Sequence, residues 1–193
     1  QTFHDCECLL ELDVSDWNVS NVTTLKGTFY GCQNLAELAV KDWEVGNVTD
    51  MSFTFRGCKQ FTTLAVDDWD VSKVTTFQSF ISAYGSSGAD QKLTTLNLSQ
   101  WDTSSATNMR SMFYGCEKIV SLHVSGLDVQ NVTSMYHMFS NCFGLKEINF
   151  AGWETSSLQD MNAMFNDCKA LETIDVSDFD TQIVTDMGQL FEN

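Results

Sequence analysis

Cysteine is the residue type in this sequence whose chemistry would matter most if its copies lay close together. The chain has seven cysteines, and six of them recur at one position of a repeat: Cys6, Cys32, Cys58, Cys116, Cys142 and Cys168. A column of buried thiols is the simpler interpretation, because a free cysteine packs as a small apolar side chain. Disulfides between neighbouring repeats remain an alternative, since an extracellular compartment permits them and the expected spacing does not exclude them.

Metal-binding and catalytic patterns are scarce. The segment His4–Cys8 contains histidine, aspartate, glutamate and two cysteines, but its spacing matches no zinc signature. The chain has three histidines and lacks HExxH, GxSxG and a phosphate-binding glycine loop. We therefore predict that the protein is not an enzyme and that it has no cofactor and no metal site.

Acidic residues form a column directly after a recurring aromatic position: Glu44, Asp70, Asp102, Asp128, Glu154 and Asp180. Like charges repeated at each turn of a stack repel one another, so they must be solvated, bonded to backbone N–H groups or shared with cations. Turn capping by aspartate is the simpler interpretation, because the glycine- and aspartate-rich nonapeptides of calcium-binding solenoids are absent. Calcium along this edge remains an alternative.

Threonines form a second polar column: Thr23, Thr49, Thr75, Thr107, Thr133 and Thr185. Each stands just before an apolar run, where its hydroxyl is expected to cap a free backbone N–H group. Regularly spaced hydroxyls could also form an ice-binding face. The residues beside them are mixed and partly charged, as at Asp50 and Asn108, which disfavours that alternative.

The charge balance restricts the class of partner. Asp and Glu number 26 against 10 Lys and Arg, so the formal net charge is -16. This charge disfavours nucleic acid and favours a basic partner. No apolar run approaches the roughly 20 residues of a membrane span, and the chain starts without the pattern of a signal peptide. We expect any export signal to have been removed or not included.

The elements that position these residues form a repeat. One position is occupied by Trp17, Trp43, Trp69, Trp101, Leu127, Trp153 and Phe179, at intervals of 26 residues with one interval of 32. The six extra residues fall in a glycine- and serine-rich stretch, which predicts an inserted loop at about 82–90. The chain has no proline. We predict one domain over residues 1–193, which begins and ends within a repeat and is expected to be a fragment of a longer array with end-to-end contacts to further repeats.

Within a unit, an LxxLxL segment such as Leu93–Leu98 precedes the aromatic position, and its alternation predicts a short strand. Apolar residues then return at helical spacing, as at Val129, Val132, Met135 and Phe139. One unit cannot bury its apolar face alone, so the units must stack. The sequence therefore predicts an α/β solenoid, a right-handed leucine-rich-repeat-like superhelix of about seven 26-residue repeats. Its parallel β-sheet would lie on one face and its short helical turns on the other.

The repeat resembles a known type. The unit at 93–116 is LTTLNLSQWDTSSATNMRSMFYGC, and the recurring form LxxLdvSnWdtSnVTnMxxMFxgC is similar to that of BspA-like bacterial surface proteins. The resemblance covers essentially the whole chain, with departures at Leu127, Phe179, Thr28 and Thr54 and at the insertion. It implies a secreted, extracellular or cell-surface protein with leucine-rich-repeat-like architecture and a role in adhesion.

The sheet side chains that point away from the core are expected to bind the partner, because they vary between repeats while the core columns do not. The predicted site comprises Glu11, Asp13, Glu37, Lys41, Thr63, Asp67, Thr95, Asn97, Ser121, His123, Glu147, Asn149, Thr173 and Asp175. We predict an adhesion or protein-recognition module for a basic protein or glycan ligand at a host or matrix surface. A structural spacer and a calcium- or ice-binding surface are the alternatives.

Overall fold

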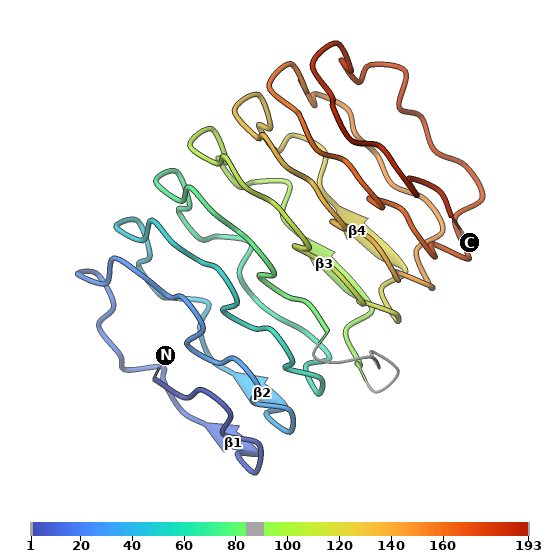
Figure 1. The fold of residues 1–193 in the computed structure, drawn as a ribbon. Helices are drawn as coiled ribbons and strands as arrows, with labels where there is room; N and C mark the ends of the chain where they lie inside the picture. The colour runs from blue at the N-terminus through green and yellow to red at the C-terminus, as the bar shows by residue number, and fades with distance from the viewer. Residues whose placement is uncertain (1, 84–90, 193) are drawn as a thin grey trace.

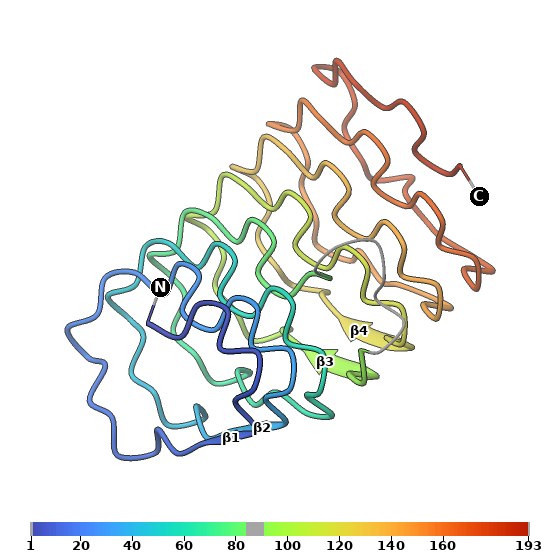
Figure 2. The same cartoon turned by 60° about the horizontal axis from the view of Figure 1, so that its bottom comes forward.

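The computed structural model describes residues 2–83 and 91–192. The chain winds into coils that lie side by side in one row, with its two ends at opposite ends of the row (Figures 1 and 2). A column of single-residue parallel β-bridges links successive coils: Thr24, Asp50, Thr76, Asn108, Ser134, Asp160 and Asp186. Bridge partners are one repeat apart in the sequence, except that the step from Thr76 to Asn108 also spans the insertion. The period of the sequence is thus also the length of one coil.

Four short strands lie in the LxxLxL segments. They are β1 (Glu11–Leu12), β2 (Glu37–Leu38), β3 (Thr95–Asn97) and β4 (Ser121–His123). β1 pairs with β2 and β3 with β4, both in parallel, giving two separate two-stranded sheets. In β3 the central Leu96 is buried and its neighbours are exposed, as strand alternation requires.

The segments expected to form helical turns are built differently, and the described residues contain no helix. In the coil that contains Leu25, every second N–H group donates to the next coil: Leu25 N to Asp50 O (3.0 Å), Gly27 N to Ser52 O (2.9 Å), Phe29 N to Thr54 O (3.0 Å) and Gly31 N to Arg56 O (2.8 Å). A helix would instead close these bonds within the segment, four residues back. Hydrogen bonding between coils therefore replaces hydrogen bonding within a helix.

Left-handed residues make this possible. Gly27 has φ 57°, and the equivalent Phe53, Ser79, Ser111 and His137 have φ between 52° and 60°. Such a conformation costs a non-glycine residue roughly 1–2 kcal/mol. The left-handed conformation turns the peptide groups so that the N–H groups of the segment face one neighbouring coil. The hydrogen bonds to that coil offset the free-energy cost of the conformation.

The core is a set of aromatic and apolar columns. Trp43, Trp69, Trp101, Trp153 and Leu127 are buried at one position of the repeat, whereas Phe179 is partly buried and Trp17 is 44% exposed. Neighbouring rings stack, as in Phe29–Phe55 with centroids 5.6 Å apart and Trp43–Trp69 at 6.4 Å. Each of the four buried indole N–H groups donates to a carbonyl of the preceding coil at 2.8–3.1 Å: Val14, Val40, Val66 and Val124. The column therefore stays buried without an unsatisfied polar atom.

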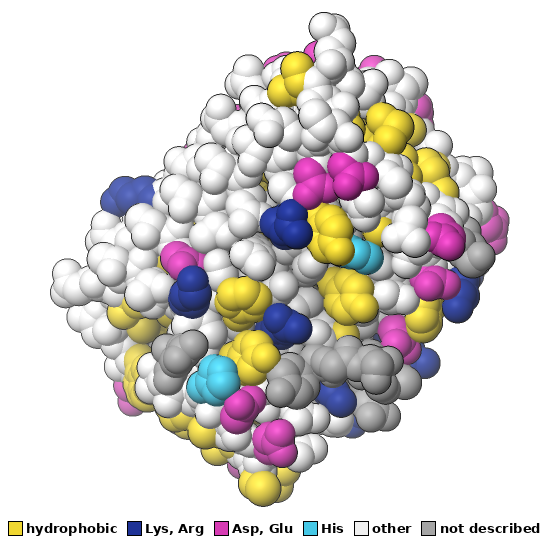
Figure 3. All heavy atoms as spheres, in the orientation of Figure 1, with side chains coloured by type: hydrophobic (Ala, Val, Ile, Leu, Met, Phe, Trp, Pro, Cys, Tyr) yellow, Lys and Arg dark blue, Asp and Glu magenta, His cyan; other side chains and the backbone are white. Residues whose placement is uncertain are grey.

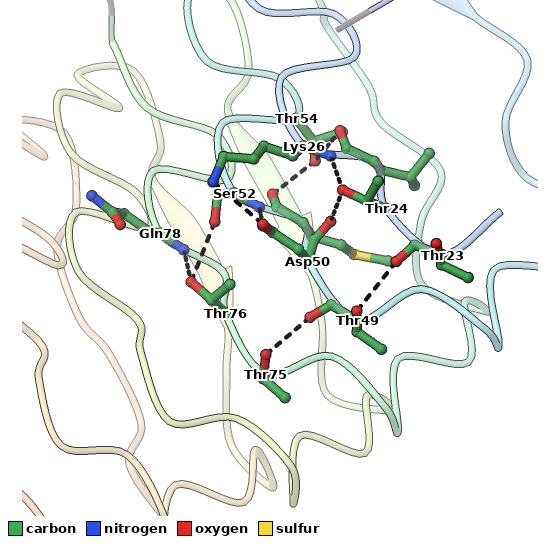
Figure 4. Close-up of polar contacts among 12 residues, drawn as sticks. Thr23, Thr24, Lys26, Thr49, Asp50, Ser52, Thr54, Thr75, Thr76 and Gln78 are labelled. Atoms are coloured by element: carbon green, nitrogen blue, oxygen red, sulfur yellow. Dashed lines mark hydrogen bonds and ion pairs between the residues drawn. The ribbon is translucent and has the colours of Figure 1, made fainter.

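The threonine column forms another link between coils. Thr49 Oγ1 donates to Thr23 O (3.3 Å) and Thr75 Oγ1 to Thr49 O (3.1 Å), and Figure 4 shows this chain of bonds. Thr107, Thr133 and Thr185 repeat the contact. These hydroxyls donate to the carbonyl of the preceding coil, whereas the sequence had predicted that they would accept from an N–H group of their own unit. The difference arises because the carbonyl of the neighbouring coil lies within reach.

The cysteine column is buried as predicted at Cys32, Cys58, Cys116, Cys142 and Cys168, whereas Cys6, in the first coil, is only partly buried. All seven cysteines are free thiols. Each of the five buried thiols donates to a carbonyl of the preceding coil at 2.9–3.3 Å. Burial raises the pKa of the Cys32 thiol to about 11 and the pKa values of Cys116 and Cys168 to about 12.

The insertion predicted at 82–90 falls mainly on residues 84–90, which lie outside the described part of the chain. Ser82 and Ala83, which precede them, are buried, and Ala83 N donates to Tyr114 O (2.7 Å). The regular bonding between coils thus continues up to the start of the insertion.

We expect Trp101→Ala to lower the free energy of unfolding by roughly 3–5 kcal/mol, because it empties a fully enclosed site in the stack. Trp17→Ala is the matched control, since Trp17 is 44% exposed and should cause a smaller loss. Denaturant unfolding of both variants measures the difference. Equal losses of stability in the two variants would mean that the buried tryptophan column is not the main core of the stack.

We expect the five buried thiols to resist alkylation in the native protein at pH 7–8. A thiol pKa of about 12 in place of 9.0 lowers the thiolate fraction about a thousandfold, and burial also blocks access. The exposed Cys8 should react first, and all seven should react after denaturation. Timed alkylation followed by mass spectrometry measures this order. Rapid native labelling of Cys116 or Cys142, or a mass lower by two hydrogens per bridged pair, would contradict the prediction.

Candidate functional site

The predicted partner-binding residues lie on the surface. Thirteen of the fourteen are exposed and Ser121 is half-buried. Eight of them line two grooves along the strands. The larger gathers Ser121, His123, Glu147, Asn149 and Thr173, and the smaller gathers Glu11, Asp13 and Glu37.

The larger groove, which we call the β4 groove, has a volume of about 710 Å³. Its lining is completed by Val120, Leu122, Lys146, Ile148 and Glu172. Leu122 and Ile148 are buried, whereas Val120 is 45% exposed. The exposed side chains that line this groove are therefore mainly polar, and Val120 adds an exposed apolar group.

The polar groups of the β4 groove are mixed in charge. Lys146 contributes a positive charge, and Glu147 and Glu172 contribute negative charges. His123 Nε2 lies 3.2 Å from Ser121 Oγ, which holds the imidazole beside the half-buried hydroxyl. The groove therefore offers both hydrogen-bond donors and acceptors.

The smaller groove, which we call the β1 groove, is acidic and has a volume of about 650 Å³. Glu11 of β1 stands directly opposite Glu37 of β2 in the parallel register. Like charges in this arrangement destabilise a strand pair, and a cationic group placed between them would relieve the repulsion.

The remaining predicted residues are distributed along the row of coils. Thr95 and Asn97 pair in register with Ser121 and His123, so they extend the β4 groove surface by one coil. Lys41 and Asp67 instead line acidic grooves beyond the carboxyl ends of the strand segments. Thr63 and Asp175 are exposed.

Several predicted binding residues have a structural role that the sequence analysis missed. Asn97 Oδ1 accepts from Ser99 N (3.1 Å) and Ser99 Oγ (2.9 Å), and Asn149 Oδ1 accepts from Ala151 N (2.9 Å). Asp13 and Asp175 accept in the same way from the serine two residues later, and these bonds, led by the serine hydroxyl, lower the pKa of both carboxyl groups. These side chains close the turn after the strand segment. The motif of Asp or Asn followed two residues later by Ser would have indicated it.

Carboxylates of the acidic column accept hydrogen bonds in similar turns. Asp70 and Asp102 accept from the backbone of Ser72 and Ser104, and Asp128 and Asp180 accept from Gln130 N and Gln182 N. Within residues 2–83 and 91–192, no group of three or more His, Cys, Asp or Glu side chains is arranged to hold a metal ion.

The face opposite the strands carries a cluster that the sequence analysis also missed. Uncharged polar side chains and backbone cover much of the face seen in Figure 3, with small groups of apolar and charged side chains between them. Arg110 Nη1 donates to Asp160 Oδ2 (2.8 Å), and its guanidinium lies 4.3 Å from the centre of the Tyr136 ring. Beside it, burial and then the charge of Arg110 lower the pKa of His137. Arg110 and Tyr136 occupy the same position of successive repeats, so the repeat spacing could have placed them side by side.

We expect Asn97→Ala to lower the free energy of unfolding by about 1 kcal/mol, because Ser99 loses the acceptor that closes its turn. Asn97→Asp keeps an acceptor oxygen and is the control. Thermal or denaturant unfolding of the two variants measures the difference. Equal stabilities of the Ala and Asp variants would show that Asn97 has no structural role. Substitutions of Asn97 could then be used to test partner binding alone.

Comparison with known proteins identifies one family. The sequence matches the family described as "Mycoplasma protein of unknown function, DUF285" over residues 1–88 and 82–193. No curated protein and no solved structure matches the chain. The described residues include no helix that is long and apolar enough to cross a membrane.

Proposed function

We propose that this chain, which belongs to the DUF285 family, is a recognition module that binds a protein partner over the β4 groove. The observation that supports this most directly is the composition of the groove. It combines the exposed apolar side chain of Val120 with a rim of polar groups of mixed charge. A partner side chain could bury apolar surface there while the rim selects its polar groups.

The variation along the strand face supports the same function. At one outward position successive coils carry Thr95, Ser121, Glu147 and Thr173, while the buried positions beside them remain apolar. Stacked strands about 4.8 Å apart give a surface on the order of 30 Å long over seven coils. This length suits a protein interface, which typically buries about 800 Å² on each partner.

The partner is expected to carry basic groups. Glu11 and Glu37 face each other in the β1 groove, and Asp13 lies beside them. A partner that spans both grooves would place a cationic group at this end. Its association rate should then fall as the salt concentration rises, because the exposed charges are screened.

The finer architectural and cellular assignments are part of the proposal. The repeat form resembles that of BspA-like proteins, and on that resemblance we propose a right-handed, leucine-rich-repeat-like solenoid that is exported to the cell surface and acts in adhesion. A binding role without catalysis fits a site whose polar groups are spread along an open groove.

Binding to a panel of purified extracellular-matrix proteins, measured by biolayer interferometry, tests the proposal. We expect at least one of them to bind, and we expect His123→Glu and Val120→Asp each to weaken that binding at least tenfold. His123→Glu adds negative charge to the rim of the groove, and Val120→Asp removes apolar contact area. Both residues are exposed, so thermal stability should change little.

Gln78→Glu is the matched control, because it adds one negative charge to the opposite side of the coil, in the turn segment that bonds to Phe53. It should leave the affinity unchanged. Failure of every matrix protein to bind, or binding that both groove variants leave intact, would refute the β4 groove as the recognition site.

A further inference from the structure

Another groove lies where the coils turn into their strand segments, and its described lining residues are not shared with the β4 groove, the β1 groove or the acidic grooves. Its volume is about 450 Å³ and eight residues line it. Three are lysines, four are asparagine or glutamine, and one is glutamate. We call it the lysine groove. In a chain with a net charge of -16, a groove with a net positive lining is a local exception.

The lysines form a row on consecutive coils. They are Lys59, Lys92 and Lys118, and Lys92 N donates to Lys59 O (2.9 Å), which brings their backbones side by side. Coils about 4.8 Å apart place the three ammonium groups within reach of one extended ligand. Although the chain has 26 acidic residues, none of the ion pairs among the described residues involves these three lysines.

Among the described residues that line the groove, one is a carboxylate. This residue, Glu7, is on the first coil and accepts from Gln33 Nε2 (2.9 Å). Other acidic side chains line grooves beyond the carboxyl ends of the strand segments, such as Asp42 and Asp68. The described lining, with three lysines and one glutamate, therefore carries a net positive charge.

The rest of the lining indicates the class of ligand. Gln33, Asn34, Gln60 and Gln91 supply amides, and the described residues that line the groove include no apolar or aromatic side chain. Gln91 is only 4% exposed, and its side chain bonds to the buried Cys116 thiol beneath the groove. A peptide-binding groove normally offers apolar pockets for anchoring side chains. A groove whose described lining is polar instead suits a ligand that carries hydroxyl groups along its length.

We infer that the lysine groove binds an acidic polysaccharide. Its carboxylate or sulfate groups pair with the ammonium groups of Lys59, Lys92 and Lys118, and its hydroxyls bond to the amides. Because lysine contributes a point charge on a flexible stem, the groove accepts either type of anion. This site is separate from the proposed protein-binding function, and either can fail without the other.

The test uses three immobilised probes and the whole chain. Heparin carries sulfate and carboxylate groups, hyaluronan carries carboxylates alone, and dextran is neutral. We expect binding to heparin, to hyaluronan or to both at about 0.15 M salt, with affinity that falls as salt increases, and no binding to dextran. Hyaluronan binding would identify carboxylate recognition, whereas binding to heparin alone would identify sulfate recognition.

The decisive variant is the triple substitution Lys59→Gln, Lys92→Gln and Lys118→Gln, which should weaken binding at least tenfold and flatten its salt dependence. The matched control is Lys26→Gln, Lys73→Gln and Lys169→Gln, which makes the same change in net charge outside the groove. It should retain the affinity of the wild-type chain within about twofold. Melting temperatures of both triple variants establish that the fold is kept.

Four results would overturn the inference. They are the absence of binding to both acidic polysaccharides, equal binding to dextran, equal losses in the two triple variants, and binding to poly-glutamate in place of the polysaccharides. The last would identify the groove as a site for acidic peptides. Loss of matrix-protein binding through His123→Glu with unchanged heparin or hyaluronan binding would show that the two sites are independent.

Discussion

The hydrogen bonds between coils are the constraint on which the rest of this structure depends. In each turn segment the N–H groups of alternate residues donate to carbonyls of the next coil, as for Leu25 to Asp50 and, across the insertion, Phe77 to Asn108. All these bonds run in the same direction along the row. A coil can therefore join the stack only if its segment has the same backbone conformation, including the left-handed residue at the position of Phe53 and His137.

The side chains extend this constraint through the core. The buried tryptophans, the buried cysteines and the threonine column all follow one rule, in which a donor on one coil bonds to a carbonyl of the coil before it, as for Trp101 to Val66 and Cys116 to Ile81. These polar groups are thus satisfied without any contact beyond the adjacent coil. Stability is consequently local, and a single hollowed coil weakens its interfaces with two neighbours.

Because the core positions must repeat, differences between coils are confined to outward positions. The strand face varies around His123, and the edge before the strands carries the lysine row in an otherwise acidic chain. The proposed protein partner and the inferred acidic polysaccharide would therefore bind to separate surfaces with opposite charge preferences. On both surfaces, the distance between neighbouring coils sets the spacing of the binding groups.

The sequence by itself determined the 26-residue period, the buried columns that contain Trp101 and Cys116, and the exposure of the strand-face residues, because periodic burial of apolar side chains follows directly from residue type. It could not determine how the turn segments bond, since apolar residues three and four apart suit both a helix and the observed turns. Only contact with a neighbouring coil decides that donors such as Gly27 N bond across coils. The lysine groove likewise required the tertiary structure, because only contact between coils brings Lys92 N to 2.9 Å from Lys59 O and gathers Lys118 into the same groove.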